Sequence, residues 1–300
     1  MEIGYVGLGS MGGALAGRLQ LTHNLLVHDQ NEAAVHRLME AGSSAADSLT
    51  DLGGRCEVIL LCLPTSDHVR AVLFGDDGLA AAVKPGTLII DQTTGDPHVT
   101  RAMAEELGRR GVALIDAPVS GGVRGAEAGT IAIMVGATQE QYDRALPILS
   151  AISPSVFHAG GVGNGHVIKL VNNVLSAAQR LLTFEGMALA AKNGVEPCTA
   201  QTILMASGGR NAYMEKIMGP NVLNGKLAAG FTLGLAHKDV RLACQLGVDS
   251  GVPMLLGNLT REIYQMCMNE MGRDAQVDTA ALVVDRIAGT HVVPSGYTLD

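Results

Sequence analysis

Residues 3–12 read Ile3-Gly4-Tyr5-Val6-Gly7-Leu8-Gly9-Ser10-Met11-Gly12, and this stretch decides the fold of the N-terminal half of the chain. A short strand leads into the pattern G-x-G-x-x-G, and a helical pattern follows at once. In that setting the first glycine allows a tight turn, the second lets a pyrophosphate approach the backbone, and the third lets helix and strand pack closely. The stretch predicts a dinucleotide-binding βαβ unit.

The next predicted strand, residues 24–28, ends at Asp29. This is about the distance from the glycine motif expected for the acid that binds the hydroxyls of the adenosine ribose. A carboxylate there would repel the 2′-phosphate of NADP, so Asp29 predicts NAD as the cofactor. The alternative is that Asp29 only caps the helix that begins near Glu32.

The alternation of strands and helices continues to about residue 158. Predicted strands cover residues 58–63, 87–91, 112–115, 131–135 and 155–158, and predicted helices cover residues 33–41, 66–74 and 139–149. Strands that alternate with helices are typical of a parallel sheet in an α/β domain. Thr94 follows one strand end, where such sheets bind ligands. We predict a cofactor contact there, with the start of the next helix as the alternative.

Residues 116–122 read Asp116-Ala117-Pro118-Val119-Ser120-Gly121-Gly122 and follow another predicted strand. A hydroxyl followed by two residues without side chains leaves backbone amides open to an anion. A plain turn is the alternative, and composition alone slightly favours it. Both interpretations stay open for these residues.

From residue 165 the pattern is helical almost to the end of the chain. One helix to about residue 193 would span about 40 Å at the α-helical rise per residue. Further helices are predicted at residues 198–206, 213–218, 235–247, 254–271 and 279–288. We therefore predict an NAD-binding Rossmann-type domain at residues 1–162 and an all-α domain at residues 163–300, joined by the long helix.

The start of that long helix, GNGHVIKLVNN at residues 163–173, carries the candidate catalytic group. On a helix Lys169 and Asn173 lie on one face, so an ammonium and a carboxamide point into the same space. That pairing suits a small oxygen-bearing substrate. A lysine rarely lies in a core without a partner or a functional role, and the neighbours that read as core here are Val167, Leu170, Val171, Val174 and Leu175. A solvated surface lysine is the alternative.

Composition narrows the possible partners and location. The chain has 47% hydrophobic residues, no Trp, a formal net charge of −8 and a pI near 5.6. The acidic balance argues against nucleic acid and an anionic membrane as partners, and no apolar run is long enough to span a bilayer. Scattered cysteines without metal-ligand spacing predict reduced thiols, no metal and a cytoplasmic location; they are Cys56, Cys62, Cys198, Cys244 and Cys267. The early dinucleotide motif leaves no room for a signal peptide.

Four stretches in the same order make the sequence similar to the β-hydroxyacid dehydrogenase family, whose members include 3-hydroxyisobutyrate dehydrogenase. They are residues 7–12, 116–122, 163–173 and 238–243, the last reading Lys238-Asp239-Val240-Arg241-Leu242-Ala243. The resemblance covers essentially the whole chain. It implies a Rossmann-type domain joined by a long helix to an all-α domain. It also implies that this second domain, residues 163–300, is a substrate and oligomerisation domain through which subunits pair as a homodimer or homotetramer.

The resemblance also implies roles for individual residues. Lys169 matches the catalytic lysine of the family. The residues that match substrate contacts are Ser120, Gly121, Gly122, Asn173 and Lys238. The residues that match cofactor contacts are Gly7, Leu8, Gly9, Met11, Gly12, Asp29, Leu63, Pro64, Thr94 and Lys238.

The sequence departs from the family pattern near the cofactor and the substrate. The family often has an asparagine where this chain has His68. Residues 208–213 fall where members differ in substrate preference. His166 and His237 flank the two lysines and could tune their pKa, although an ordinary hydrogen-bonding role is favoured for each.

The implied activity is hydride transfer between a small anionic 3-hydroxy acid, of the 3-hydroxyisobutyrate type, and the nicotinamide of NAD, with Lys169 as general acid and base. A semialdehyde reductase of the same family, of the tartronate semialdehyde type, is one alternative. An imine reductase is disfavoured by Lys169, and a decarboxylating 6-phosphogluconate dehydrogenase by the chain length. A catalytically silent NAD-binding regulator has no reason to arrange Ser120, Lys169, Asn173 and Lys238.

Overall fold

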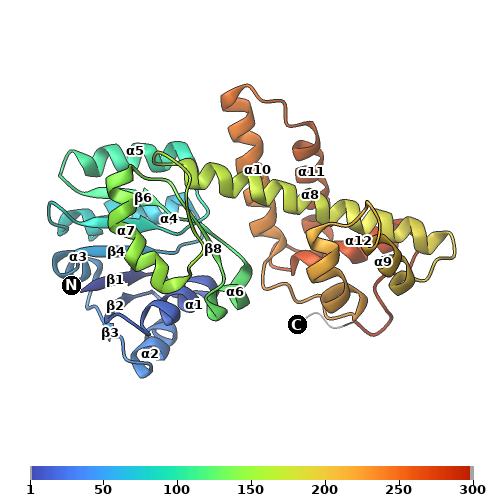
Figure 1. Cartoon of the computed structure of the whole chain (residues 1–300), viewed down its shortest axis with the longest axis horizontal. Coiled ribbons are helices and arrows are strands. Elements are labelled where there is room, and N and C mark those ends of the chain that lie inside the picture. Colours follow the sequence, from blue (N-terminus) through green and yellow to red (C-terminus); the bar gives the residue numbers. More distant parts are fainter. Residues whose placement is uncertain (1, 298–300) are drawn as a thin grey trace. The chain divides into compact units, whose positions relative to one another are not determined.

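The computed structural model describes residues 2–297, and the chain divides into two compact units at residues 1–169 and 170–300. The first is an α/β unit, blue to green in Figure 1, and the second is helical, yellow to red. The division falls inside helix α8 (Asn164–Lys192), so this helix belongs to both units. The predicted sequence of an α/β domain, a long helix and a helical domain is confirmed.

The α/β unit is built on a parallel sheet with the strand order β3-β2-β1-β4-β5-β6. Its strands are β1 (Ile3–Val6), β2 (Leu25–His28), β3 (Ser44–Ala45), β4 (Val58–Leu61), β5 (Leu88–Asp91) and β6 (Ala113–Asp116). The strand order reverses between β1 and β4, and in open α/β sheets ligands bind beside the carboxyl ends of the strands at such a point. This is the Rossmann-type sheet that the sequence predicts.

Side chains alternate along the strands between two apolar cores, one on each face of the sheet. In β4, Val58 and Leu60 lie in one cluster while Ile59 and Leu61 lie in the other. The first cluster includes α1 (Ser10–Leu19), α2 (Glu32–Glu40) and α7 (Gln139–Ile152), and the second includes α3 (Leu49–Arg55), α4 (Ser66–Phe74) and α5 (Pro97–Gly108). Burial on both faces explains why these strands read as continuous apolar runs.

The later strands form a separate small sheet instead of extending the parallel one. β7 (Val119–Ser120) pairs antiparallel with β8 (Ala132–Val135), and β8 pairs in parallel with β9 (Val156–His158). Residue periodicity predicts β8 and β9 but does not say which sheet a strand joins, because its partners are distant in sequence.

Several short elements of the α/β unit have no counterpart in the sequence prediction, among them β3, α3 and α6 (Gly122–Ala128). α3 contains Gly53 and Gly54, which are poor helix formers, and it depends on the side chain of Ser48, which accepts a hydrogen bond from the backbone of Asp51. Short elements of this kind are stabilised by packing on the sheet, and a sequence pattern indicates them weakly.

The helical unit continues from α8 through α9 (Pro197–Met205), α10 (Leu233–Ser250), α11 (Leu255–Met271) and α12 (Ala280–Ala288). α10 and α11 lie side by side (Figure 1). The helix predicted at residues 213–218 is instead a π-helical segment, Met214–Leu223, with Pro220 inside it. Among residues 2–297, every helix is too short or too polar to traverse a lipid bilayer.

A buried charged network ties the helical unit together. Arg180 of α8 lies 3.3 Å from Asp278 Oδ1 and donates a hydrogen bond to the hydroxyl of Tyr264 at 3.1 Å. Asp278 also accepts hydrogen bonds from the Tyr213 hydroxyl and from Asn221, both at 2.8 Å. Because a carboxylate is costly to bury unless its oxygens are paired, these contacts hold α8, the π-helical segment and α11 around one point.

Candidate active site

The three glycines of the turn after β1 do not all serve the same purpose. Gly7 has φ +92°, and a Cβ on it would lie 2.3 Å from the carbonyl oxygen of Cys62. A Cβ on Gly12 would lie 2.0 Å from the carbonyl oxygen of Gly7, whereas one on Gly9 would have no atom within 4 Å. Gly7 and Gly12 are therefore required by the packing of the protein, and Gly9 leaves open space beside the backbone.

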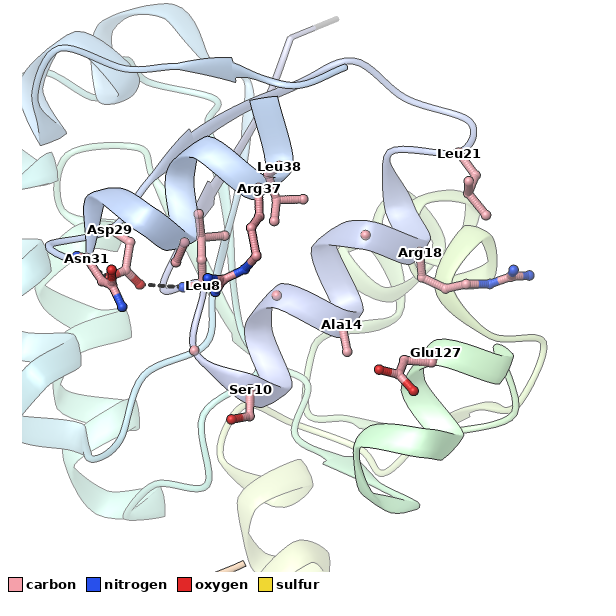
Figure 2. A pocket seen from close by; sticks show the side chains of 14 residues that line it. Leu8, Ser10, Ala14, Arg18, Leu21, Asp29, Asn31, Arg37, Leu38 and Glu127 are labelled. Atoms are coloured by element: carbon pink, nitrogen blue, oxygen red, sulfur yellow. Dashed lines mark hydrogen bonds between the residues drawn. The ribbon is translucent and has the colours of Figure 1, made fainter. Parts of the chain in front are cut away.

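A groove of about 680 Å³ runs along α1 from this turn (Figure 2). At one end Asp29 accepts hydrogen bonds from the backbone amides of Leu8, at 2.5 Å, and Asn31, at 2.7 Å. Leu21 lies at the other end. The lining residues are Leu8, Gly9, Ser10, Gly13, Ala14, Gly17, Arg18, Leu21, Asp29, Asn31, Ala34, Arg37, Leu38 and Glu127.

The helix-capping interpretation of Asp29 is wrong. The N-cap of α2 is Asn31, whose side chain accepts a hydrogen bond from the backbone amide of Ala33 at 3.1 Å. One oxygen of Asp29 instead accepts from the amide of Leu8 in the glycine turn and the other from the amide of Asn31, so the carboxylate is held at the carboxyl end of β2. α1 begins at Ser10 after Gly9, without a side-chain cap, which leaves its first amides for an anion. These residues fit a dinucleotide.

The predicted cofactor residues Leu63, Pro64 and Thr94 follow β4 and β5, two neighbouring strands of the sheet. Thr93 links the two strand ends: its hydroxyl oxygen accepts a hydrogen bond from the amide of Leu63 at 3.0 Å, and its amide donates to Asp91 Oδ1 at 3.0 Å. Thr94 does not start a helix, because α5 begins at Pro97 and Asp96 is its cap.

The structure also describes the contacts of His68 and of Arg210, which belong to the two stretches where the sequence departs from the family pattern. His68 lies in the first turn of α4, where its Nδ1 is 2.7 Å from the hydroxyl oxygen of Thr65. In the helical unit, Arg210 forms an ion pair with Glu215 at 3.1 Å, next to the π-helical segment.

The predicted anion site begins at Ser120, the last residue of β7. Gly121 has φ +147° and Gly122 has φ +70°, conformations that favour glycine. α6 starts at Gly122, so a short helix, and not a turn alone, separates this stretch from β8; the anion site itself stays a prediction. A Cβ on Gly122 would meet no atom within 4 Å, and the backbone there is accessible.

Lys169 lies in the second turn of α8, and only 8% of its surface is exposed. Asp116, which is fully buried, holds the start of this helix: its Oδ1 accepts from the amide of Gly163 at 2.6 Å and its Oδ2 from the amide of His166 at 2.7 Å. The expectation that the surrounding apolar residues are core is only partly right. Leu170 is buried, but Val171 and Leu175 are 42% and 57% exposed.

His166 makes the hydrogen bonds of a buried structural residue. Its Nε2 is 2.8 Å from the carbonyl oxygen of Thr93, and its Nδ1 is 3.1 Å from the hydroxyl of Thr100. Asp91 Oδ2 lies 4.0 Å from Nε2. Burial raises the pKa of the Asp91 carboxyl above its usual range, and the nearby imidazole opposes that change.

In the helical unit, Asp239 of α10 brings two predicted substrate residues together. The side-chain nitrogen Nδ2 of Asn173 donates a hydrogen bond to Asp239 Oδ2 at 2.6 Å. Lys238 Nζ forms an ion pair with Asp239 Oδ1 at 3.1 Å. Asp239 is 3% exposed. Its role is missing from the sequence prediction, although it follows Lys238 directly in one of the family stretches and could have been singled out there.

Other titratable groups are poorly suited to catalysis. Burial raises the pKa of the Cys62 thiol to about 12, so it is not a nucleophile near neutral pH. Partial burial, together with neighbouring arginines, lowers the pKa of His237, so it contributes no fixed cation next to Lys238. Within residues 2–297, no group of three His, Cys, Asp or Glu side chains could hold a metal ion.

Two protein families match consecutive parts of the chain. Residues 2–161 match the NAD binding domain of 6-phosphogluconate dehydrogenase, and residues 163–284 match the family described as NAD-binding of NADP-dependent 3-hydroxyisobutyrate dehydrogenase. The chain belongs to the β-hydroxyacid dehydrogenase family. This β-hydroxyacid dehydrogenase is accordingly an NAD(P)-dependent oxidoreductase.

Individual relatives cover most of this dehydrogenase. The 3-hydroxyisobutyrate dehydrogenase of Pseudomonas aeruginosa is 36% identical over 274 residues, which is 88% of this chain and 91% of the relative. The NAD-dependent L-serine dehydrogenase of the same organism is 37% identical over 276 residues, 90% and 93% of the two chains. The structure of Mycobacterium tuberculosis 3-hydroxyisobutyrate dehydrogenase with L-serine has a TM-score of 0.83, with 27% identity over 95% of this chain and 98% of the other.

Proposed function

We propose that this dehydrogenase interconverts a small 3-hydroxy acid, of the 3-hydroxyisobutyrate type, and its aldehyde with NAD as cofactor. The observation that carries the proposal is Lys169, a buried lysine on a helix whose start is held by the buried carboxylate of Asp116. It occurs in a unit that also has the glycine turn and the groove of a dinucleotide site. Relatives named for 3-hydroxyisobutyrate and L-serine support the substrate class, because both molecules carry a hydroxyl on the carbon β to a carboxylate.

In the proposed mechanism Lys169 moves the hydroxyl proton. In the oxidation direction its neutral amine accepts the proton from the substrate hydroxyl, and in the reduction direction its ammonium returns one to the forming alkoxide. A bound nicotinamide would supply the hydride-accepting group for oxidation of the carbinol carbon. The protein supplies orientation and the proton acceptor.

Five residues are proposed to hold the substrate: Ser120, Gly121, Gly122, Asn173 and Lys238. The amides after Ser120 suit a carboxylate, and Lys238 supplies a cation. Asp239 supports this arrangement because one N–H of Asn173 is bound to it, which sets the rotation of the carboxamide and leaves the other N–H directed away from the carboxylate. Fixed donors of this kind reduce the cost of ordering the substrate.

Formation of NADH tests the proposed activity. The protein is mixed with NAD and a panel containing 3-hydroxyisobutyrate, serine, glycerate and threonate, and absorbance of NADH is followed. We expect kcat/KM to be highest for a member of this panel, and at least about 100-fold lower for lactate, in which misplacement of the hydroxyl by one carbon removes it from Lys169.

Two results would change the assignment. Faster turnover with tartronate semialdehyde and NADH than with any 3-hydroxy acid and NAD would favour the semialdehyde reductase. NADH binding without turnover of any compound would favour the catalytically silent regulator.

Asp29 supports NAD over NADP, since its carboxylate is fixed at the carboxyl end of β2, where the adenosine ribose of a bound dinucleotide would lie. Arg37 lines the same groove, so removing the carboxylate leaves a cation that can receive a 2′-phosphate. We expect Asp29→Ser to lower the ratio of kcat/KM for NAD to that for NADP by about 10-fold or more, equivalent to about 1.4 kcal/mol. Initial rates with both cofactors measure it. Asn31→Ala is the control, because it removes the cap of α2 but keeps the carboxylate of Asp29. An unchanged ratio of kcat/KM for NAD to that for NADP in Asp29→Ser would contradict the role of Asp29 in selecting NAD.

Two further expectations are kept as proposals. A cytoplasmic location is supported by the cysteines, all five of which are free thiols. A homodimer or homotetramer formed through the helical unit is supported by large apolar side chains exposed on its helices. Leu182 and Leu189 of α8 and Leu255 and Leu256 of α11 are 68–80% exposed.

A further inference from the structure

The fully buried imidazole of His166 has no part in the proton transfer described above, yet it joins two segments that carry proposed site residues. Its contacts are the carbonyl oxygen of Thr93 at 2.8 Å and the hydroxyl of Thr100 at 3.1 Å. Both partners lie in the α/β unit, after β5 and in α5. The histidine itself lies in the first turn of α8.

The carbonyl partner fixes which nitrogen of His166 carries a proton. A carbonyl oxygen only accepts hydrogen bonds, so Nε2 must be the donor to Thr93. Nδ1 lies 3.1 Å from the hydroxyl of Thr100, which can either donate a hydrogen bond or accept one. Both ring nitrogens are satisfied, and the ring has one orientation in which this holds.

The backbone of Gly95 lies close against the ring of His166. A Cβ on Gly95 would come within 3.0 Å of His166 Cε1 and 2.7 Å of the hydroxyl of Ser66. The backbone of His166 is equally constrained, because its amide donates to the buried carboxylate of Asp116 at 2.7 Å. The histidine is therefore held at both its main chain and its side chain.

Thr93 in turn connects His166 to the two strand ends proposed to contact the cofactor. The hydroxyl oxygen of Thr93 accepts a hydrogen bond from the backbone amide of Leu63, and the backbone amide of Thr93 donates one to Asp91. Thr94 is the next residue in the chain. On the other side, Lys169 follows His166 by three residues in the same helix. One hydrogen bond thus links the segment before Thr94 to the helical turn before Lys169.

We propose that His166 is a positioning residue: by donating Nε2–H to the Thr93 carbonyl, it sets the start of α8, and with it Lys169, relative to the strand-end segment that carries Thr94. This inference rests on the proposed function, in which Lys169 moves the proton and Thr94 contacts the cofactor. It predicts that the loss of this one donor slows hydride transfer more than it weakens binding, because a displacement of about 1 Å at a reacting group can cost roughly 100-fold in rate.

Two variants of equal length separate the donor from the packing. His166→Gln keeps an N–H that can reach the Thr93 carbonyl, and His166→Met fills a similar volume without a donor. Thr100→Val is the matched control, because it removes the other hydrogen bond of the same imidazole and keeps the bond to Thr93. For each protein we measure kcat, KM for the hydroxy acid, the NADH dissociation constant by fluorescence, Tm, and the isotope effect on kcat with substrate deuterated at the carbinol carbon.

We expect kcat of His166→Met to fall by roughly 10- to 100-fold, with an isotope effect larger than that of the wild type and an NADH dissociation constant changed by less than about 3-fold. His166→Gln should recover most of the lost kcat. Thr100→Val should keep a wild-type kcat and isotope effect even where its Tm falls as much as that of His166→Met.

A wild-type kcat and isotope effect in His166→Met, with only a lower Tm, would show that His166 is structural and would overturn the proposal. Equal losses of kcat in all three variants would overturn it too. If His166→Met does not fold, His166→Asn is compared with His166→Gln instead. The side-chain amide of asparagine reaches toward Thr100 but not Thr93. Failure of the proposed function and failure of the positioning role can be told apart. If the wild-type protein turns over no hydroxy acid, the proposed function fails. If the wild-type protein is active and His166→Met is equally active, only the positioning role of His166 fails.

Discussion

Lys169→Ala is expected to lower kcat for the hydroxy acid by about 1,000-fold, within the range that a positioned general acid or base supplies. The reason is that the substrate hydroxyl then loses its proposed proton acceptor, while the glycine turn and Asp29, the proposed cofactor contacts, are unchanged. NADH binding should therefore stay within about 3-fold of wild type, because its contacts are made elsewhere. Steady-state rates and fluorescence titration with NADH measure the two quantities separately.

The control for this variant lies in the same helix. Lys192→Ala removes a lysine whose ammonium donates to the carbonyl of Gly289, and it should leave kcat unchanged. Lys169→Met, which keeps the length of the side chain without the amine, should lose as much activity as Lys169→Ala if the proton is what matters. A kcat near the wild-type value in either Lys169 variant would remove this residue from the mechanism.

The second large effect concerns stability. Gly12→Ala is expected to destabilise the α/β unit by about 3 kcal/mol, the upper part of the usual range for overpacking a tight contact. The added methyl would lie 2.0 Å from the backbone carbonyl oxygen of Gly7, and backbone atoms cannot turn aside as a flexible side chain can. Urea unfolding followed by circular dichroism measures the loss of free energy.

Gly9→Ala gives the matched comparison for Gly12→Ala. Its methyl would meet no protein atom within 4 Å, so the free energy of unfolding should change by less than about 1 kcal/mol, as for an ordinary Gly-to-Ala exchange. NADH binding should weaken by about 10-fold or more, since the methyl occupies the space left for a pyrophosphate at the helix start. Equal stability losses in the two variants would contradict the division of roles among the glycines.

Local patterns were enough to predict most of the fold. The strand before Gly7 ends at Val6 as predicted, and the predicted helix at residues 66–74 is α4. The strand predicted at residues 58–63 ends two residues earlier, at Leu61. Beyond that point the amide of Leu63 donates to the side chain of Thr93 and not to a neighbouring strand. The proposed domain boundary between residues 162 and 163 stays a prediction, although the contacts of the chain divide inside α8.

The candidate site was predicted less completely, because a pattern identifies a residue type and not its partner. Lys169 stands out as a charge among apolar neighbours, and Asp29 by its distance from the glycine motif. Asp116 was part of a family stretch but carried no predicted role, and nothing near it in sequence indicates that it binds the amides of Gly163 and His166.

By itself the sequence determined what depends on neighbours a few residues away: the glycine turn, the apolar strands, the long helix and the face shared by Lys169 and Asn173. These follow from backbone geometry and from residue periods that repeat within one element. Only the tertiary structure decided that Asp116 holds the start of α8 and that His166 reaches Thr93. Those bonds join residues 47, 50 and 73 positions apart. Such groups meet because β5 and β6 are parallel neighbours in the sheet, so that the segments after both strands lie at the same edge.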